Sequence, residues 1–370
     1  MPTFDSTPQS HPSAGPARKI PRWGLSAAAL ASVLVMGTAM QSADAFSPDT
    51  LAVADHADGS GTGTNILLMG TDSRDTITEQ QKKKYRLGGQ GCDCSDTMML
   101  VHIAQDRERV SVVSIPRDSL AELPAHTDRR TGESHEAHLA KINAAHAEGG
   151  GDLAMRTVEA KTGLDIDRFL AVDFSRFMKS VDELRGVDVC TATPLRDPST
   201  GLDLAAGTHH LGGGDSLRYA RSRKVDNAAD FGRMQRQQRF LVSFVKEMRN
   251  DGTLHSAARL KELAGVLLSA DRTEKALTPL ELVSLAGDLR QITLSSLEFA
   301  TVPISDFDAD VEGVGSTLVW DETRAAVVFD TLRRDRPLTE ATAALPSRPA
   351  DGTARQGEFV PVEGPALECR

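Results

Sequence analysis

Three short runs of apolar and β-branched residues lie in the first third of the chain. They are NILLMG (residues 65–70), TMMLVHIA (97–104) and RVSVVSIP (109–116). Each run is apolar at consecutive positions and is too short for a helix, so we expect strands that are buried inside a sheet. The residues QDRE join the second run to the third, which predicts a hairpin.

Segments with the helical spacing of apolar residues alternate with the β-rich runs. One predicted helix is opened by Asp152 and ended by Gly163, another begins near Phe231, and a capping box at Thr278–Glu281 opens a third. The other expected elements are helices over 174–186, 254–270 and 321–335 and strands over 167–174, 186–193 and 297–304. This order predicts a single α/β/α domain over residues 64–336, with a central mixed β-sheet and helices on both faces.

The N-terminal segment indicates where the chain resides. An uncharged run, residues 24–40, follows three basic residues, Arg18, Lys19 and Arg22. The run has about the minimum length of a transmembrane helix, and the basic flank predicts a cytoplasmic N-terminus. The expected segments are a cytoplasmic tail (1–22), a transmembrane anchor (23–41) and a linker (42–63), with the folded domain outside the cell. The alternative is a signal peptide cleaved after Ala45, which would give a secreted protein.

The C-terminal segment and the cysteines complete the organisation. Residues 337–370 lack periodicity, so we expect a disordered tail. The chain has four cysteines: Cys92, Cys94, Cys190 and Cys369. Exported chains keep disulfides, and the CxC pair has no second cysteine or histidine pair at zinc-like spacing. A disulfide from Cys92 or Cys94 to Cys190 is therefore favoured over a metal site.

The charge of the chain is uneven. With 42 basic and 52 acidic residues, the formal charge is −10, which argues against a nucleic-acid partner because such partners need a broad basic surface. Residues 218–239 depart from this balance, with six arginines and one lysine against two aspartates. Arginine binds phosphate and carboxylate through a planar fork of donors. The stretch therefore predicts an anion site, and a solvated, charged helix face is the alternative.

Two aspartates lie at predicted strand ends, where ligands bind in α/β folds. Asp72 follows the first strand, and Asp96 opens the second. Carboxylate oxygens suit Mg²⁺, which keeps several waters and uses few protein ligands. Turn formation and capping are the alternative roles of these residues.

Polar side chains from three separate segments form the candidate anion site. They are Arg117, Lys141, Arg221, Arg223, Arg233 and Gln237. Arg221 and Arg223 would share one face if the segment YARSR is extended. Arg233 and Gln237 share one face of the helix that begins near Phe231, at positions i and i+4. The start of that helix would also direct backbone amides at an anion.

Other sequence motifs give little support to other chemistries. The sequence contains no GxxxxGK[ST] loop and no GxSxG turn, so neither a P-loop nucleotide site nor an α/β-hydrolase serine is indicated. Four histidines lie between residues 126 and 146. Because they lack acidic or cysteine partners at a fixed spacing, we expect ordinary surface-loop residues.

Five motifs follow one another along the chain: NILLMGTDSR, SDTMMLVHI, VSIPRDS, KINAAHAEGG and DSLRYARSRKVDNAADFGRMQRQQ. In this order and spacing, the chain resembles the LytR-CpsA-Psr family of cell-wall enzymes over residues 64–250. The resemblance implies an extracytoplasmic, membrane-anchored phosphotransferase that uses Mg²⁺. Such enzymes move a glycopolymer from a polyprenyl-pyrophosphate carrier to a sugar hydroxyl of peptidoglycan and release polyprenyl phosphate.

The resemblance also implies roles for individual residues. Asp72 and Asp96 match the metal-binding aspartates, and with Arg117 they form the implied catalytic set. The residues that match the pyrophosphate-binding positions are Arg117, Lys141, Arg221, Arg223, Arg233 and Gln237. The chain departs from the family at His146, where an aromatic residue is common after KINAA. The residues also leave open a polyprenyl-pyrophosphate phosphatase and a non-catalytic, envelope-bound regulator.

Overall fold

The structure of the chain is a computed structural model. It describes residues 63–74, 76–88, 91, 95–226, 228–268, 273, 275–344 and 360–368. The predicted cytoplasmic tail and anchor, and nearly all of the predicted linker, lie outside these ranges. Within the described ranges, no helix has the length and apolar character needed to cross a membrane. Residues 57–370 form one compact unit.

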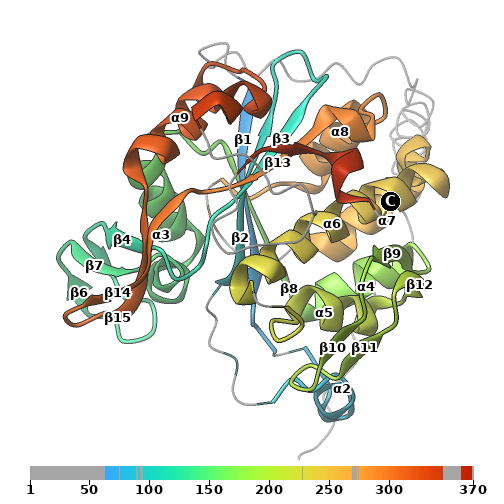
Figure 1. Cartoon of the computed structure of the whole chain (residues 1–370), viewed down its shortest axis with the longest axis horizontal. Helices are drawn as coiled ribbons and strands as arrows, with labels where there is room; N and C mark the ends of the chain where they lie inside the picture. Colours follow the sequence, from blue (N-terminus) through green and yellow to red (C-terminus); the bar gives the residue numbers. More distant parts are fainter. Residues whose placement is uncertain are drawn as a thin grey trace, which may run out of the picture. The chain divides into compact units, whose positions relative to one another are not determined.

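A six-stranded sheet forms the centre of this unit, in the order β16-β13-β3-β2-β1-β8 (Figure 1). Its strands are β1 (Thr64–Thr71), β2 (Ser95–Ile103), β3 (Val110–Ser114), β8 (Arg168–Asp173), β13 (Leu297–Thr301) and β16 (Val362–Glu363). β2 pairs antiparallel with β1 and β3, whereas β8 pairs parallel with β1, and β13 with β3. The sheet is therefore mixed, and the hairpin predicted across QDRE is confirmed.

Helices and small two-stranded sheets surround the central sheet. The helices are α2 (Glu79–Lys84), α3 (Ala144–Thr162), α4 (Phe174–Glu183), α5 (Gly213–Arg221), α6 (Ala229–Asn250), α7 (Ala257–Leu267), α8 (Pro279–Asp288) and α9 (Glu322–Arg333). Short 3-10 helices are η2 (Thr253–His255), η3 (Leu294–Ser296), η4 (Leu338–Ala344) and η5 (Gly364–Leu367). The paired outer strands are β4 (Leu120–Leu123) with β7 (His138–Lys141), β5 (His126–Thr127) with β6 (Ser134–His135), β9 (Val187–Thr191) with β12 (Gly207–Leu211), β10 (Leu195–Asp197) with β11 (Leu202–Leu204), and β14 (Ile304–Val311) with β15 (Gly315–Trp320).

Neighbouring residues on each central strand pack into two different cores. Leu67 and Val113 belong to a core on one face of the sheet, together with side chains of α3 and α9. Ile66 and Val112 belong to a core on the other face, together with side chains of α6 and α8. Figure 1 shows these two pairs of helices on opposite sides of the sheet. Successive strand side chains point to opposite faces, so consecutive apolar residues are what a sheet covered on both faces requires, as predicted.

The ends of α8 and α3 test the helix boundaries that the sequence predicts. The capping box at Thr278 forms, with the Thr278 side chain accepting from the N–H of Glu281 and the Glu281 side chain accepting in return. α3 ends before Gly163, as predicted, but its predicted start at Asp152 is wrong because it begins at Ala144. At Gly150, φ is 68° and ψ is −160°, a conformation that glycine takes readily. α3 therefore bends there.

Part of the predicted disordered tail is folded. Val362 of β16 pairs with Phe299 of β13, Leu367 is buried in the core that includes Phe299, and Leu338 is buried in the core under α9. The prediction for residues 337–370 is wrong for these segments, because burial of their apolar side chains offsets the entropy of ordering a few residues.

Cys190, on β9, forms a disulfide, as the predicted bridge requires. Cys92, Cys94 and Cys369 lie outside the described residues, so the pairing itself stays a prediction.

Candidate functional site

Three predicted site residues lie at one edge of the central sheet. The register of β1 and β2 pairs Thr71 with Ser95, so Asp72 after β1 and Asp96 near the start of β2 lie at the same edge. β3 runs antiparallel to β2 and ends at that edge too, which places Arg117 beside Asp96. The antiparallel order of three consecutive strands therefore assembles the site.

Arg117 is the centre of a series of ion pairs. Its Nη1 contacts Asp96 Oδ1, and its Nε lies 3.5 Å from Asp118 Oδ2. Lys141, at the end of β7, lies 3.3 Å from Asp118 through its Nζ. Burial alone would lower the pKa of Arg117, but the carboxylates of Asp96, Asp230 and Asp118 outweigh it and raise that pKa. The guanidinium group therefore stays charged.

The series continues through α6. Arg233 Nη1 lies 3.7 Å from Asp96 Oδ1, and Arg233 Nη2 lies 3.0 Å from Asp230 Oδ1. Arg223 Nε lies 2.9 Å from the same Asp230 oxygen. The whole series alternates in sign and runs Lys141–Asp118–Arg117–Asp96–Arg233–Asp230–Arg223. Five predicted site residues are therefore joined by direct contacts.

Arg233 is the most buried cation of this series. Only 3% of the residue is exposed, and this burial lowers its pKa. It lies in the second turn of α6, with Asp230 in the first turn. A carboxylate near a helix start and a buried guanidinium group one turn later support each other electrostatically.

Arg221 differs from the other arginines of the site. It is the last residue of α5, so YARSR is not extended at this point, and Arg221 and Arg223 do not share a strand face. Its guanidinium group lies over the ring of Phe174, 5.0 Å from the centroid. Burial lowers the pKa of Arg221, and the nearby charges of Asp72 and Asp96 oppose that shift.

Three guanidinium nitrogens of the site have unused donor capacity. Arg117 Nε, Arg221 Nη1 and Arg233 Nε are buried and have no hydrogen-bond acceptor among the described residues. A buried donor without an acceptor costs about 1–3 kcal/mol. An anion with several oxygens would supply the missing acceptors.

Gln237 has a supporting position. Its Nε2 donates to the carbonyl oxygen of Ala220 at 3.2 Å, so it connects α6 to the last turn of α5. That contact holds the backbone next to Arg221. Gln237 and Arg233 lie one turn apart on α6, as predicted. Gln237 acts on the site indirectly, because it holds the backbone of the residue before Arg221.

The two predicted metal ligands have different partners. Asp72 is buried and binds Arg74 through both carboxylate oxygens, whereas Asp96 binds Arg117 and Arg233. The charges of both carboxylates raise the pKa of Arg221 against the effect of burial, so both lie near the same guanidinium group. Their oxygen donors and their shared location fit a hard cation such as Mg²⁺.

Sequence reasoning did not assign three further residues of the site. Asp118 and Asp230 each connect two cations, and Arg74 holds Asp72. A signal for two of them is present in the sequence. Asp118 follows Arg117 directly, and Asp230 precedes Arg233 by one helical turn.

The arginine-rich stretch has more than one role. Arg236 is 3% exposed and binds Asp226 and the carbonyl oxygen of Ser222, each at 2.6 Å. These contacts hold the segment between α5 and α6. Arg218 binds Asp215 at 2.7 Å. Arg236 does not match a solvated helix face, whereas the pair of Arg218 with Asp215 on α5 is partly exposed. Both arginines stabilise the local structure around the anion site.

His146 occupies the position where the sequence departs from the family. It is 4% exposed, lies in the first turn of α3 and stacks on Phe169 with ring centroids 6.2 Å apart. Its flat ring thus packs against the core, which is what an aromatic residue would do there.

A family model described as the LytR_cpsA_psr family matches residues 33–334. The chain belongs to this family. Its sequence is 31% identical over 272 residues to the probable cell wall biosynthesis protein LcpB of Corynebacterium glutamicum. This match covers 73% of this chain and 61% of LcpB. It is also 31% identical over 205 residues to the polyisoprenyl-teichoic acid–peptidoglycan teichoic acid transferase TagV of Bacillus subtilis, covering 54% of this chain and 47% of TagV. The chain thus spans about half to three fifths of these relatives.

Solved structures of family members share the fold. The crystal structure of B. subtilis TagV superposes with a TM-score of 0.55 at 25% identity and covers 75% of this chain and all of that chain. TagT with bound octaprenyl pyrophosphate has a TM-score of 0.51 at 20% identity, with 74% of this chain and 91% of TagT covered. At that identity the likeness to TagT shows the fold alone.

Proposed function

We propose that the chain transfers a glycopolymer from a polyprenyl-pyrophosphate carrier to peptidoglycan. The observation that carries the proposal is the set of buried donors without hydrogen-bond acceptors on Arg117, Arg221 and Arg233. Arg117 and Arg233 belong to the ion-pair series, and Arg221 lies near its Asp96. A pyrophosphate offers several oxygens to such donors. The family relative TagV, named as a teichoic acid transferase to peptidoglycan, supports the choice of reaction.

The chemistry needs positioning and positive charge more than covalent catalysis. A sugar hydroxyl of peptidoglycan attacks the phosphorus that bears the polymer and releases its proton. The bond from that phosphorus to the bridging oxygen breaks, and polyprenyl phosphate leaves. Arg221 and Arg233 donate to phosphate oxygens on which negative charge increases, and Arg117 holds the same group from the segment after β3.

Mg²⁺ is part of this proposal, with Asp72 and Asp96 as its ligands. When bound, the ion would supply further positive charge to the pyrophosphate oxygens. Lys141 and Arg223, at the two ends of the ion-pair series, would contact the outer oxygens. The carrier lipid implies attachment to the membrane, which the uncharged run over residues 24–40 would provide.

The test is a transfer assay with the full-length chain. Labelled lipid-linked oligosaccharide, peptidoglycan and Mg²⁺ are incubated together, and label is measured on peptidoglycan and in solution. We expect label on peptidoglycan. Release of label into solution alone would replace the transferase by a polyprenyl-pyrophosphate phosphatase, and binding without turnover would indicate a non-catalytic, lipid-binding regulator.

A further inference from the structure

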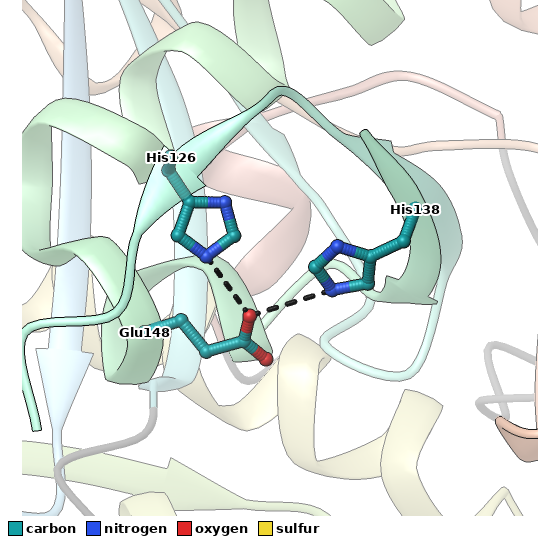
Figure 2. A group of neighbouring side chains, drawn as sticks. All are labelled: His126, His138 and Glu148. Atoms are coloured by element: carbon teal, nitrogen blue, oxygen red, sulfur yellow. Dashed lines mark hydrogen bonds and ion pairs between the residues drawn. The ribbon is translucent and has the colours of Figure 1, made fainter. Parts of the chain in front are cut away.

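Three side chains outside the anion site converge on one point (Figure 2). His126 lies on β5, His138 on β7 and Glu148 in the first part of α3. Nε2 of His126 is 3.1 Å from Glu148 Oε2, and Nε2 of His138 is 3.4 Å from the same oxygen. The candidate ligand atoms of the three residues all lie within 4.8 Å of one another.

This cluster corrects the expectation of ordinary surface-loop histidines. The acidic partner that the sequence seemed to lack is Glu148, which comes from a helix and not from the loop. The bend at Gly150 separates the short helical segment that carries Glu148 from the rest of α3. No fixed spacing reveals such a partner, because β5, β7 and the bent helix meet only in the folded chain.

The hydrogen-bond partner of Nδ1 shows which nitrogen of each ring carries the hydrogen. His126 Nδ1 lies 2.8 Å from the carbonyl oxygen of Pro124, and His138 Nδ1 lies 3.1 Å from the carbonyl oxygen of Glu136. A carbonyl oxygen only accepts, so each Nδ1 carries a proton and donates. In a neutral ring, Nε2 then presents its lone pair. Two lone pairs therefore face one carboxylate oxygen of Glu148.

With neutral rings, the two Nε2 lone pairs and the Glu148 carboxylate bring three acceptors together. The rings of His126, His135 and His138 lie with their centroids 5.5, 5.6 and 5.8 Å apart. The His126 side chain is only 2% exposed, so water has little access to its Nε2. A cation at the centre gives every acceptor a partner.

We propose that Nε2 of His126, Nε2 of His138 and the carboxylate of Glu148 bind a divalent transition metal of the zinc class. Two histidines and one glutamate are a known zinc ligand set, and imidazole ligands select zinc over Mg²⁺. Histidine ligands of metals usually donate their other N–H to a carbonyl or carboxylate, as both rings do here. The His138 side chain is 36% exposed, which leaves an open side for water or an external ligand.

The metal would join the outer hairpins to α3. β7 runs from His138 to Lys141, and Lys141 contacts Asp118 of the ion-pair series. A metal at His138 would thus fix one end of a strand whose other end carries a cation of the anion site. The proposal stands on the cluster alone and does not depend on the transferase function.

The test measures zinc binding by the purified full-length chain after treatment with a chelator. Zn²⁺ alone is titrated into the wild type, His138→Gln and His209→Gln. His209 is a control because its Nε2 contacts the carbonyl oxygen of Ala205 on a different hairpin. We expect one zinc per chain in the wild type and in the control. Loss of the hydrogen bond that a metal-ligating histidine makes through its other nitrogen lowers metal affinity about 10–100-fold. Loss of the ligand itself in His138→Gln should therefore lower zinc affinity at least about 100-fold.

Two further readouts keep the test clear. His138→Gln should melt in a cooperative transition, which shows that the variant is folded. Zn²⁺ should raise the melting temperature of the wild type and His209→Gln but not that of His138→Gln, which shows that this variant has lost the site. Co²⁺ in place of zinc should give visible absorption without a thiolate charge-transfer band, because no cysteine is a ligand. A thiolate band, equal zinc affinity in His138→Gln, or no zinc bound by the folded wild type would each overturn the proposal.

Discussion

Replacing Arg221 with methionine should make the protein more stable and less active. The Arg221 guanidinium group is placed in the site at a cost, because its Nη1 is buried without an acceptor and burial lowers its pKa. Methionine keeps a flexible, unbranched apolar side chain beside the Phe174 ring. It loses the cation–π contact of the guanidinium group, but it has no buried donor to satisfy. A residue of a binding site that is strained or unsatisfied without its ligand is a common origin of a conflict between stability and activity.

The size of the effect follows from these contacts. A buried donor without a partner costs about 1–3 kcal/mol, and the attraction of Asp72 and Asp96 recovers part of that cost. We expect Arg221→Met to raise the free energy of unfolding by about 1 kcal/mol, the lower end of that range. In contrast, loss of one transition-state donor lowers the rate by about 10²–10³-fold.

The control is Arg218→Met, one turn earlier on the same helix. Arg218 binds Asp215 at 2.7 Å and the carbonyl oxygen of Lys84, so this variant should lose stability and keep the transfer rate. Denaturant unfolding gives the free energies, and the peptidoglycan transfer assay gives the rates. If Arg221→Met transfers label at the wild-type rate, or is less stable than Arg218→Met, the assignment of Arg221 to the anion site is wrong.

Three other changes test neighbouring parts of the structure. Asp96→Asn should lower the transfer rate in a way that high Mg²⁺ partly restores; a rate independent of Mg²⁺ would contradict the role of Asp96 as a ligand. For Asp197, burial alone would raise the pKa, but the backbone N–H groups of Arg223 and Lys224 donate to its carboxylate and lower it. Its stabilisation is therefore present above the unfolded pKa of about 3.9 and is lost as the pH falls through the lower folded value. Asp197→Ala should cost about 2 kcal/mol at neutral pH, a difference that shrinks in unfolding experiments below about pH 4; a constant difference would refute this sign. Cys190→Ser should cost about 2–5 kcal/mol, and an unchanged melting temperature would show that the bridge does not stabilise the fold.

The parts of the fold that the sequence predicts are those set by local pattern. Consecutive apolar residues such as Ile66 and Leu67 show that both faces of β1 are covered, and the capping box at Thr278 fixes the start of α8. The common edge at which Asp72 and Asp96 lie follows from the same strands, because β1 pairs antiparallel with β2 and Thr71 lies opposite Ser95. These features depend on residues close together in the chain.

The parts that the sequence does not predict depend on which distant groups meet. Arg221 could end a helix or lie in a strand, and the packing of α5 on Phe174 decides this. Nothing in the sequence distinguishes Asp230 from an aspartate on the surface. Only the fold places it between Arg223 and Arg233. Glu148 of α3 meets His126 of β5 across 22 residues of the chain. Tertiary contacts outweigh local preference at such positions.

Under the proposed function, the aspartates of the ion-pair series would make the site selective before any ligand arrives. Asp96, Asp118 and Asp230 pair with cations that an incoming anion would have to share. A small anion with one charge, such as chloride or acetate, would gain too little to compete with a carboxylate already in place. A pyrophosphate would reach several guanidinium groups at once and compete with all of the carboxylates together. Until then, the carboxylates hold the arginine side chains in position.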